Sequence, residues 1–233
     1  MTGKAIRRFN PEDKSKPKVW TANICPFAAK ARIAFNELGV DYDQVEVDLG
    51  NKPASLFDVN PKGQVPALLD QGNNINDSYI VVQYINEMWA GVDKKNLLPD
   101  EPVKRAVART WCDFISTNVV KAFYEILLLP TQAEQDASKV KLLGFLKTIN
   151  DEMKKISDGP FFMGDKFGIV DILLAPHVDR FPAIENKGFV LPETGDYDRF
   201  RSWFQAVKEV PSFKSELVDA DFVKAQYGKY GKK

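Results

Sequence analysis

The sequence has little of the residue types on which many catalytic and metal sites depend. It contains one histidine, His177, among 233 residues. Because His177 follows a proline inside an apolar segment, we expect a structural role rather than a catalytic triad or a zinc site. The two cysteines, Cys25 and Cys112, are too few for a disulfide framework. The sequence alone does not exclude one disulfide bond between them, but two thiols in a chain of this size suit a reducing, cytoplasmic location.

An excess of one charge and long apolar runs are also absent. Lysine plus arginine number 32, aspartate plus glutamate also number 32, and the formal net charge is zero. This balance gives no electrostatic reason to expect nucleic acid as the main partner. No apolar run approaches the roughly 20 residues that a membrane-spanning helix needs. We therefore expect no nucleic-acid partner, no membrane partner and no resident metal.

The composition that is present belongs to a folded globular protein. Hydrophobic residues make up 44% of the chain and charged residues 27%, close to the averages for globular domains. We expect residues 1–17 to form a solvated leader. The hydrophobic pattern then predicts strands at 19–21, 42–49 and 65–69, a short helix at 52–58, longer helices at 26–38 and 78–88, and a hairpin turn at 72–74.

A polar, proline-containing segment at 93–102 is expected to link two domains. Beyond it the strand pattern disappears, and helices are predicted at 103–129, 132–156, 169–181 and 197–207. The predicted fold class is therefore an α/β N-terminal domain at 18–92 followed by an all-α C-terminal domain at 103–233.

Cys25 is the first candidate for chemistry, since it lies between a predicted strand and a predicted helix. Pro26 follows it, and proline favours the first position of a helix, so Cys25 stands at or beside the N-cap. The free N–H groups and positive end of a helix can lower a thiol pKa from about 8.5 to roughly 3.5–7.5. We therefore expect an activated thiolate, with an inert packed thiol as the alternative. Ala28 stands where a dithiol site has its second cysteine, so a resolving thiol must come from outside the chain.

Two further positions suit a peptide-like ligand. Pro66 inside a strand pattern indicates a turn or a cis bond, which would leave the backbone of Val65 available to an extended ligand. The alternative is an edge-strand proline without a ligand. Asp77 and Ser78 open a predicted helix, where Ser78 is a cap candidate and Asp77 could pair with a ligand ammonium. A plain helix cap is the alternative there.

Together these motifs resemble the cytosolic glutathione transferases, and most closely their cysteine-type branch, the omega, lambda and dehydroascorbate-reductase classes. Cys-Pro-Phe-Ala at 25–28 is the active-site motif of that branch. Asn-Lys-Pro at 51–53, Asn-Pro-Lys-Gly-Gln-Val-Pro at 60–66 and Asp-Ser at 77–78 follow in the family's order. Leu-Leu-Pro at 97–99 and Phe-Phe-Met-Gly-Asp at 161–165 are omega-like. The resemblance covers about residues 18 to 210 and implies a thioredoxin-like N-terminal domain joined to an all-helical C-terminal domain.

The resemblance also implies roles for individual residues. Cys25 would be the catalytic nucleophile and would form a mixed disulfide with glutathione, the co-substrate. Lys52 would reach the glycine carboxylate of glutathione, Val65 would pair with its cysteinyl backbone, and Asp77 with Ser78 would hold its γ-glutamyl end. The complete set implied for glutathione binding is Phe27, Lys52, Gln64, Val65, Pro66, Asp77 and Ser78.

One position departs from the family pattern. The core helix of the family begins with a serine or threonine and an aspartate three residues later, but Gly168 precedes Asp171 here. Glycine can cap a helix without supplying a hydroxyl, so we expect this helix start to be weaker by a few tenths of a kcal/mol.

The predicted function is a glutathione-dependent thiol transferase or reductase, with a glutathionylated substrate, another disulfide or dehydroascorbate as acceptor. Conjugation of glutathione to electrophiles and non-catalytic binding of glutathione or another ligand remain alternatives. A membrane-inserting chloride-channel relative of this fold shares Cys-Pro-Phe, but Lys30 and Arg32 in the first helix make insertion costly. The omega resemblance also implies a homodimer.

Overall fold

The computed structural model of the chain describes residues 6–10, 12–13, 15–91 and 95–229. The chain divides into two compact units, Met1–Asn96 and Leu97–Lys233. The division falls inside the segment predicted as a linker, of which residues 93 and 94 lie outside the described residues. Leu97 and Leu98 are buried, and the carbonyl of Leu97 accepts a hydrogen bond from Ile169 N–H in the second unit. The exact limits of the two domains stay a prediction.

The first unit is built on a four-stranded sheet with the order β2-β1-β3-β4. Strand β1 (Lys18–Thr21) pairs in parallel with β2 (Asp43–Glu46) and antiparallel with β3 (Ala67–Asp70), which in turn pairs antiparallel with β4 (Asn73–Asn76). The register sets Trp20 opposite Ala67 and Ala67 opposite Asn76. The chain therefore leaves β1, β2 and β4, and enters β3, at the same end of the sheet.

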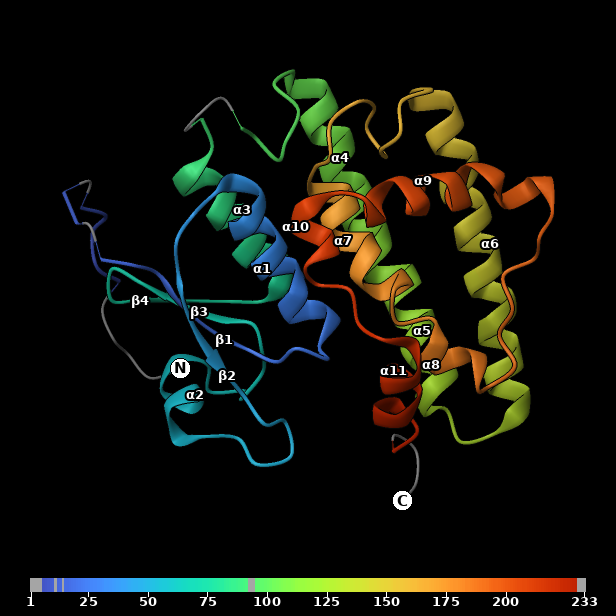
Figure 1. Cartoon of the computed structure of the whole chain (residues 1–233), viewed down its shortest axis with the longest axis horizontal. Helices are drawn as coiled ribbons and strands as arrows, with labels where there is room; N and C mark the ends of the chain where they lie inside the picture. The colour runs from blue at the N-terminus through green and yellow to red at the C-terminus, as the bar shows by residue number, and fades with distance from the viewer. Residues whose placement is uncertain (1–5, 11, 14, 92–94, 230–233) are drawn as a thin grey trace. The chain divides into compact units, whose positions relative to one another are not determined.

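Three helices complete the first unit. Helices α1 (Pro26–Leu38) and α3 (Ser78–Trp89) pack against each other beside the sheet (Figure 1). Ala28, Ala31 and Ala34 of α1 are fully buried, and these small side chains permit close packing of the two helices. Helix α2 (Ala54–Val59) packs on β3, where Leu56 and Val59 join Trp20, Val47 and Ala67 in a separate core.

The second and third predicted strands differ in extent from the structure. The segment predicted at 42–49 is a strand only over 43–46, and the segment predicted at 65–69 begins at Ala67. The hairpin itself is confirmed, but its turn is Gln71-Gly72, with φ of 47° and 74°. Positive φ at both central residues is the geometry of a two-residue hairpin turn. Asn73 and Asn74, predicted as turn residues, therefore belong to β4.

Residues 6–10 of the leader lie against this hairpin. Arg7 N–H donates to Asn73 Oδ1 over 2.8 Å, and Asn10 N–H donates to Gln71 Oε1 over 2.9 Å. Residues 6–10 are exposed, as predicted for a solvated leader, but these two bonds give them a defined position on the first unit.

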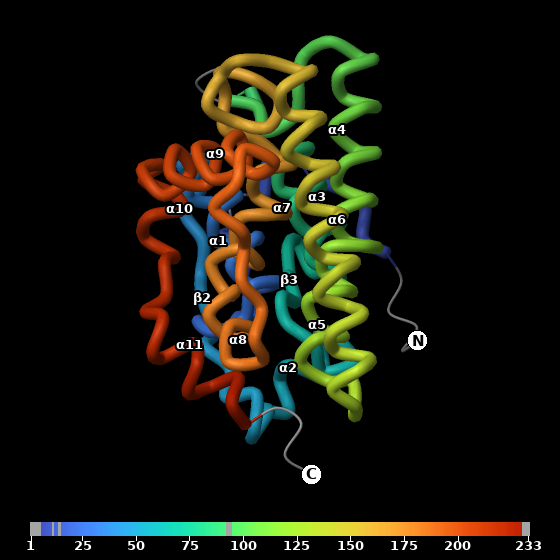
Figure 2. Tube along the Cα trace, turned by 90° about the vertical axis from the view of Figure 1, so that its right-hand side faces the viewer, coloured from blue at the N-terminus to red at the C-terminus, as the bar shows by residue number. Residues whose placement is uncertain are grey.

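The second unit begins with one long helical column (Figure 2). Its parts are α4 (Pro102–Phe114), a π-helical turn (Ile115–Val119) and α5 (Val120–Leu128), which together occupy the helix predicted at 103–129. Helix α6 (Gln132–Ile156) packs along α5 and starts with a capping box in which Thr131 and Glu134 bond each other's backbone N–H.

Helix α7 (Ile169–Val178) is buried along its entire length and ends three residues before the predicted limit. Its start is fixed by Asp171, whose carboxylate accepts hydrogen bonds from Gly168 N–H, Phe162 N–H and Trp203 Nε1–H at 2.9, 2.9 and 2.6 Å. The aspartate half of the capping box is thus present without a hydroxyl at Gly168.

The remaining elements of the second unit are shorter. They are α8 (Pro182–Glu185), a 3-10 turn (Gly195–Tyr197), α9 (Asp198–Lys208), α10 (Pro211–Lys214) and α11 (Ala220–Tyr227). Only α9 is predicted from the sequence, since one or two helical turns show too little of the hydrophobic repeat. Among the described residues, no helix has both the length and the apolar character needed to cross a membrane.

Candidate functional site

Cys25 occupies the N-cap of α1, with Pro26 at the first helical position as predicted. The residue is half-buried, and its backbone is extended, with φ of −78° and ψ of 116°. Its N–H donates to the carbonyl of Ala22 over 2.9 Å, and its own carbonyl accepts from Ala29 over 3.0 Å. The end of β1 and the first turn of α1 together fix the position of the thiol.

The expectation of a lowered thiol pKa is wrong for this structure. Burial raises the pKa of Cys25 above its ordinary value. The backbone N–H groups of Ala28 and Phe27, and the positive charges of Arg32 and Lys30, lower the pKa of Cys25 but do not offset the effect of burial. The helix end could be read from the sequence, whereas the desolvation comes from tertiary packing.

Two buried cations on α1 support this position, and the sequence interpretation gave them no role in the site. Arg32 donates to Thr21 Oγ1 and to the carbonyl of Ala22, the same carbonyl that accepts from Cys25 N–H. Arg32 therefore holds the turn that carries the thiol. Lys30 Nζ lies 4.9 Å from the centre of the Phe27 ring, a cation–π contact. The sequence signal was a lysine and an arginine inside the otherwise apolar run 26–35.

The Val65–Pro66 peptide bond is cis, which confirms the backbone geometry that Pro66 indicated in the sequence. Val65 is half-buried, and its N–H and C=O form no hydrogen bond with any residue that the structure describes. The loop is held instead by Asn60 Nδ2, which donates to the carbonyl of Gln64 over 2.9 Å. Val65 thus offers an unpaired donor and acceptor, while the Gln64 side chain is exposed.

Asp77, rather than Ser78, is the N-cap of α3. Its Oδ1 accepts from Tyr79 N–H over 2.9 Å and from Ile80 N–H over 3.3 Å. Asp77 has φ of +75°, a conformation that residues other than glycine rarely adopt and that often marks functional positions. Ser78 is the first residue of the helix and is 8% exposed.

Lys52 is exposed in the loop between β2 and α2, and it forms no ion pair with the described residues. Like the segments that carry Cys25, Val65 and Asp77, this loop emerges at the common end of the sheet defined by the strand register. The sheet topology therefore brings the predicted site residues to one region of the first unit. Among the described residues there is no group of three or more histidine, cysteine, aspartate or glutamate side chains suited to a metal.

Comparison with known proteins assigns the family. Residues 20–91 match the family "Glutathione S-transferase, N-terminal domain", and residues 132–206 match "Glutathione S-transferase, C-terminal domain". The chain belongs to the glutathione S-transferase family. Glutathione S-transferase U19 of Arabidopsis thaliana is 35% identical over 198 residues, which cover 84% of this chain and 87% of the relative.

Solved structures of the family share this fold. The Tau class glutathione S-transferase of mango, Mangifera indica, has a TM-score of 0.84 at 26% identity, over 93% of this chain and 99% of that one. Glutathione transferase Omega 3C of Trametes versicolor has a TM-score of 0.79 at 26% identity, over 89% and 91%. The predicted combination of a thioredoxin-like domain and a helical domain is confirmed. Since both Tau and Omega class structures are similar, assignment to the cysteine-type branch stays a prediction.

Proposed function

We propose that this glutathione S-transferase catalyses glutathione-dependent thiol transfer through a mixed disulfide at Cys25. The observation that carries the proposal is the placement of a cysteine sulfur at the N-terminus of α1, at the same end of the sheet as the unpaired backbone of Val65. A thiol in that position can form a disulfide with bound glutathione, whereas a hydroxyl cannot.

The surrounding groups suit the three parts of glutathione. The N–H and C=O of Val65 are available for its central cysteinyl residue, as in an added β-strand. Lys52 supplies a positive charge for the glycine carboxylate. At the γ-glutamyl end, Ser78 and the N-terminus of α3 suit the carboxylate, and Asp77 suits the ammonium group. Phe27, Gln64 and Pro66 complete the proposed binding set.

The reaction has two exchange steps. In the first, the Cys25 thiolate attacks the glutathionyl sulfur of a mixed disulfide substrate, a new S–S bond forms, and the substrate leaves as a thiolate that takes up a proton. In the second, the thiolate of a free glutathione attacks the same sulfur and releases Cys25. One disulfide is reduced, and two glutathione units are joined as oxidised glutathione. External glutathione is needed because Ala28 replaces the resolving cysteine.

The raised pKa of Cys25 supports a second candidate, conjugation of glutathione to an electrophile. A thiol that keeps its proton can donate a weak hydrogen bond to the thiolate of bound glutathione and leave that thiolate as the nucleophile. In the thiol-transfer reaction, the same proton must first leave. The N–H groups of Ala28 and Phe27, with the charges of Arg32 and Lys30, then stabilise the enzyme thiolate.

Replacement of Cys25 separates the two reactions. We expect Cys25→Ser to reduce glutathione-dependent reduction of a glutathionylated peptide at least about a hundredfold, because the serine cannot form the mixed disulfide. Cys112→Ser is the matched control, since Cys112 is buried in α4, and it should retain the activity. Undiminished reduction by Cys25→Ser would overturn the proposal. A wild-type protein that only conjugates glutathione to an electrophile would establish the second candidate.

Three further properties are proposed: the location, the oligomeric state and an alternative acceptor. A cytoplasmic location agrees with two free thiols, Cys25 and Cys112. A homodimer agrees with the family, and light scattering that gives the mass of one chain would contradict it. Dehydroascorbate is a proposed alternative acceptor, to be tested by direct reduction with glutathione. Turnover with either the glutathionylated peptide or dehydroascorbate would exclude a purely ligand-binding role.

A further inference from the structure

One buried asparagine, Asn60, closes the loop between α2 and β3. It is 4% exposed and directly follows the last residue of α2. Its N–H donates to the carbonyl of Leu56 over 2.8 Å, and its carbonyl accepts from Gly63 N–H over 2.7 Å. Its Oδ1 accepts from Lys62 N–H over 3.1 Å, and its Nδ2 donates to the carbonyl of Gln64 over 2.9 Å. The backbone and the side chain of this one residue therefore hold both the end of the helix and the loop that follows.

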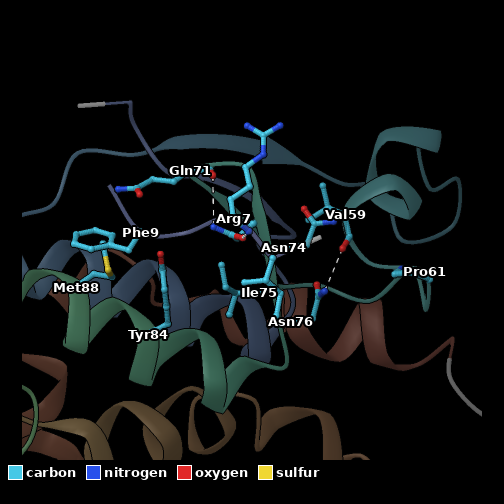
Figure 3. A pocket seen from close by; sticks show the side chains of 13 residues that line it. Arg7, Phe9, Val59, Pro61, Gln71, Asn74, Ile75, Asn76, Tyr84 and Met88 are labelled. Atoms are coloured by element: carbon cyan, nitrogen blue, oxygen red, sulfur yellow. Dashed lines mark hydrogen bonds between the residues drawn. The ribbon is translucent and has the colours of Figure 1, made fainter. Parts of the chain in front are cut away.

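The end of α2 from which Asn60 emerges is itself fixed to the sheet. Asn76 Nδ2 donates to the carbonyl of Val59 over 3.1 Å, as Figure 3 shows. Asn74 Nδ2 donates to the carbonyl of Asp58, also over 3.1 Å. Both asparagines lie on β4, and Val59 belongs to the core that α2 shares with the sheet. The bonds of Asn60 therefore start from a point whose place on the sheet is set.

The side-chain bond of Asn60 sets the direction of the next backbone donor. The Gln64–Val65 peptide is trans, because Val65–Pro66 is the only cis bond among the described residues. In a planar trans peptide the C=O and the N–H point in opposite directions. Since the Gln64 carbonyl points to Asn60 Nδ2, the Val65 N–H points away from Asn60. That N–H pairs with no residue that the structure describes, so it is presented to a ligand.

The double role of the Asn60 side chain requires an amide, which offers an acceptor and a donor from one short planar group. An aspartate keeps the acceptor for Lys62 N–H but has no donor for the Gln64 carbonyl. A serine hydroxyl can accept from the N–H two residues further on, but it is too short to reach the Gln64 carbonyl as well. These two substitutions therefore remove the same donor, the first with an added charge and the second without one.

We propose that Asn60 is a positioning residue for glutathione: it holds the Gln64 carbonyl so that the Val65 N–H faces the cysteinyl carbonyl of the bound tripeptide. Asn60 acts through this peptide and does not itself contact glutathione. The inference rests on the glutathione site of the proposed function, but not on the mixed disulfide at Cys25. Without the Nδ2 donor, the peptide between residues 64 and 65 is free to turn, and the bound tripeptide loses one hydrogen bond.

The test is calorimetric titration with S-methylglutathione, which cannot form a disulfide with Cys25. We expect Asn60→Asp to bind it about five- to tenfold more weakly than the wild type, the size of one hydrogen bond. Asn60→Ser should weaken binding to a similar extent without an added charge, and it decides the result if Asn60→Asp does not fold. Asn74→Asp is the matched control, because it removes an amide-to-carbonyl bond and adds a charge at the same end of α2. It should keep the wild-type affinity.

Kinetics separate positioning from a general loss of structure. With a glutathionylated peptide as substrate, Asn60→Ser should raise the KM for glutathione about five- to tenfold and leave kcat within about twofold. A loosened fold would instead lower kcat, because fewer molecules would be active.

The outcomes also separate this inference from the proposed function. Wild-type affinity for S-methylglutathione in both Asn60 variants, or an equal loss in Asn74→Asp, would overturn the positioning role and leave the proposed reaction at Cys25 in place. A lower kcat with an unchanged KM would overturn it as well. A wild-type protein that does not bind S-methylglutathione would overturn both the positioning role and the proposed glutathione site.

Discussion

Replacing Asp171 with alanine should strongly destabilise the helical unit. The Asp171 carboxylate is fully buried and accepts from Phe162 N–H, Gly168 N–H and Trp203 Nε1–H. Alanine leaves all three donors without this acceptor, and each buried unsatisfied donor costs about 1–3 kcal/mol. Because water entering the vacated space would satisfy part of this set, we expect a net loss of about 3–5 kcal/mol. That is a large share of the roughly 5–15 kcal/mol by which domains are stable.

The assay is equilibrium unfolding in urea, followed by tryptophan fluorescence and by far-UV circular dichroism. Trp203 is buried and bonded to Asp171, so its emission reports on this part of the second unit. Asp165→Ala is the matched control, because Asp165 is an exposed carboxylate just before α7, and its loss should cost under about 0.5 kcal/mol. Equal unfolding midpoints for the two variants would refute the assignment of Asp171 as the organising group.

Three more predictions follow from the structure. Gly63→Ala should lower stability by about 1–2 kcal/mol in thermal unfolding, because φ is +59° and the new Cβ would lie 2.5 Å from the Phe57 ring. If Gly63→Ala costs as much stability in a Phe57→Ala background as in the wild type, the steric clash is contradicted. Burial raises the pKa of Asp171 from 3.8 to about 6. The stability of the wild type relative to Asp171→Asn should therefore be highest below pH 4 and fall by up to about 3 kcal/mol as the pH rises through 6. A difference in unfolding free energy that does not change with pH would count against the raised pKa. Because burial raises the pKa of Cys25, its alkylation rate with iodoacetamide should still be rising at about pH 9, whereas levelling off below pH 7 would indicate a lowered pKa.

The fold was predictable where local signals agreed. Helix α1 has a proline at its start, an apolar face and Gly39 in the left-handed conformation at its end, and all three are visible in the sequence. The limits of the other elements depend on contacts with distant segments. Strand β2 lies at the edge of the sheet and stops after Glu46, although the alternating pattern continues to residue 49. The π-helical turn at Ile115–Val119 interrupts a continuous helical pattern without a glycine or proline to mark it.

The candidate site was predictable as a set of positions but not in its electrostatics. The placement of Cys25 at the helix start and the cis bond before Pro66 agree with the sequence prediction. The helix cap at Asp77 differs, because the residue takes a positive φ that the sequence does not reveal. The direction of the Cys25 pKa shift and the role of Arg32 both depend on burial, which arises from packing between distant segments.

The most direct test of the proposed reaction is the intact mass of the protein after incubation with oxidised glutathione, followed by peptide mapping. We expect one glutathionyl group on Cys25 that reduced glutathione removes. No adduct, or an adduct on Cys112 alone, would contradict the mixed-disulfide reaction at Cys25 and leave conjugation as the chemistry of this site.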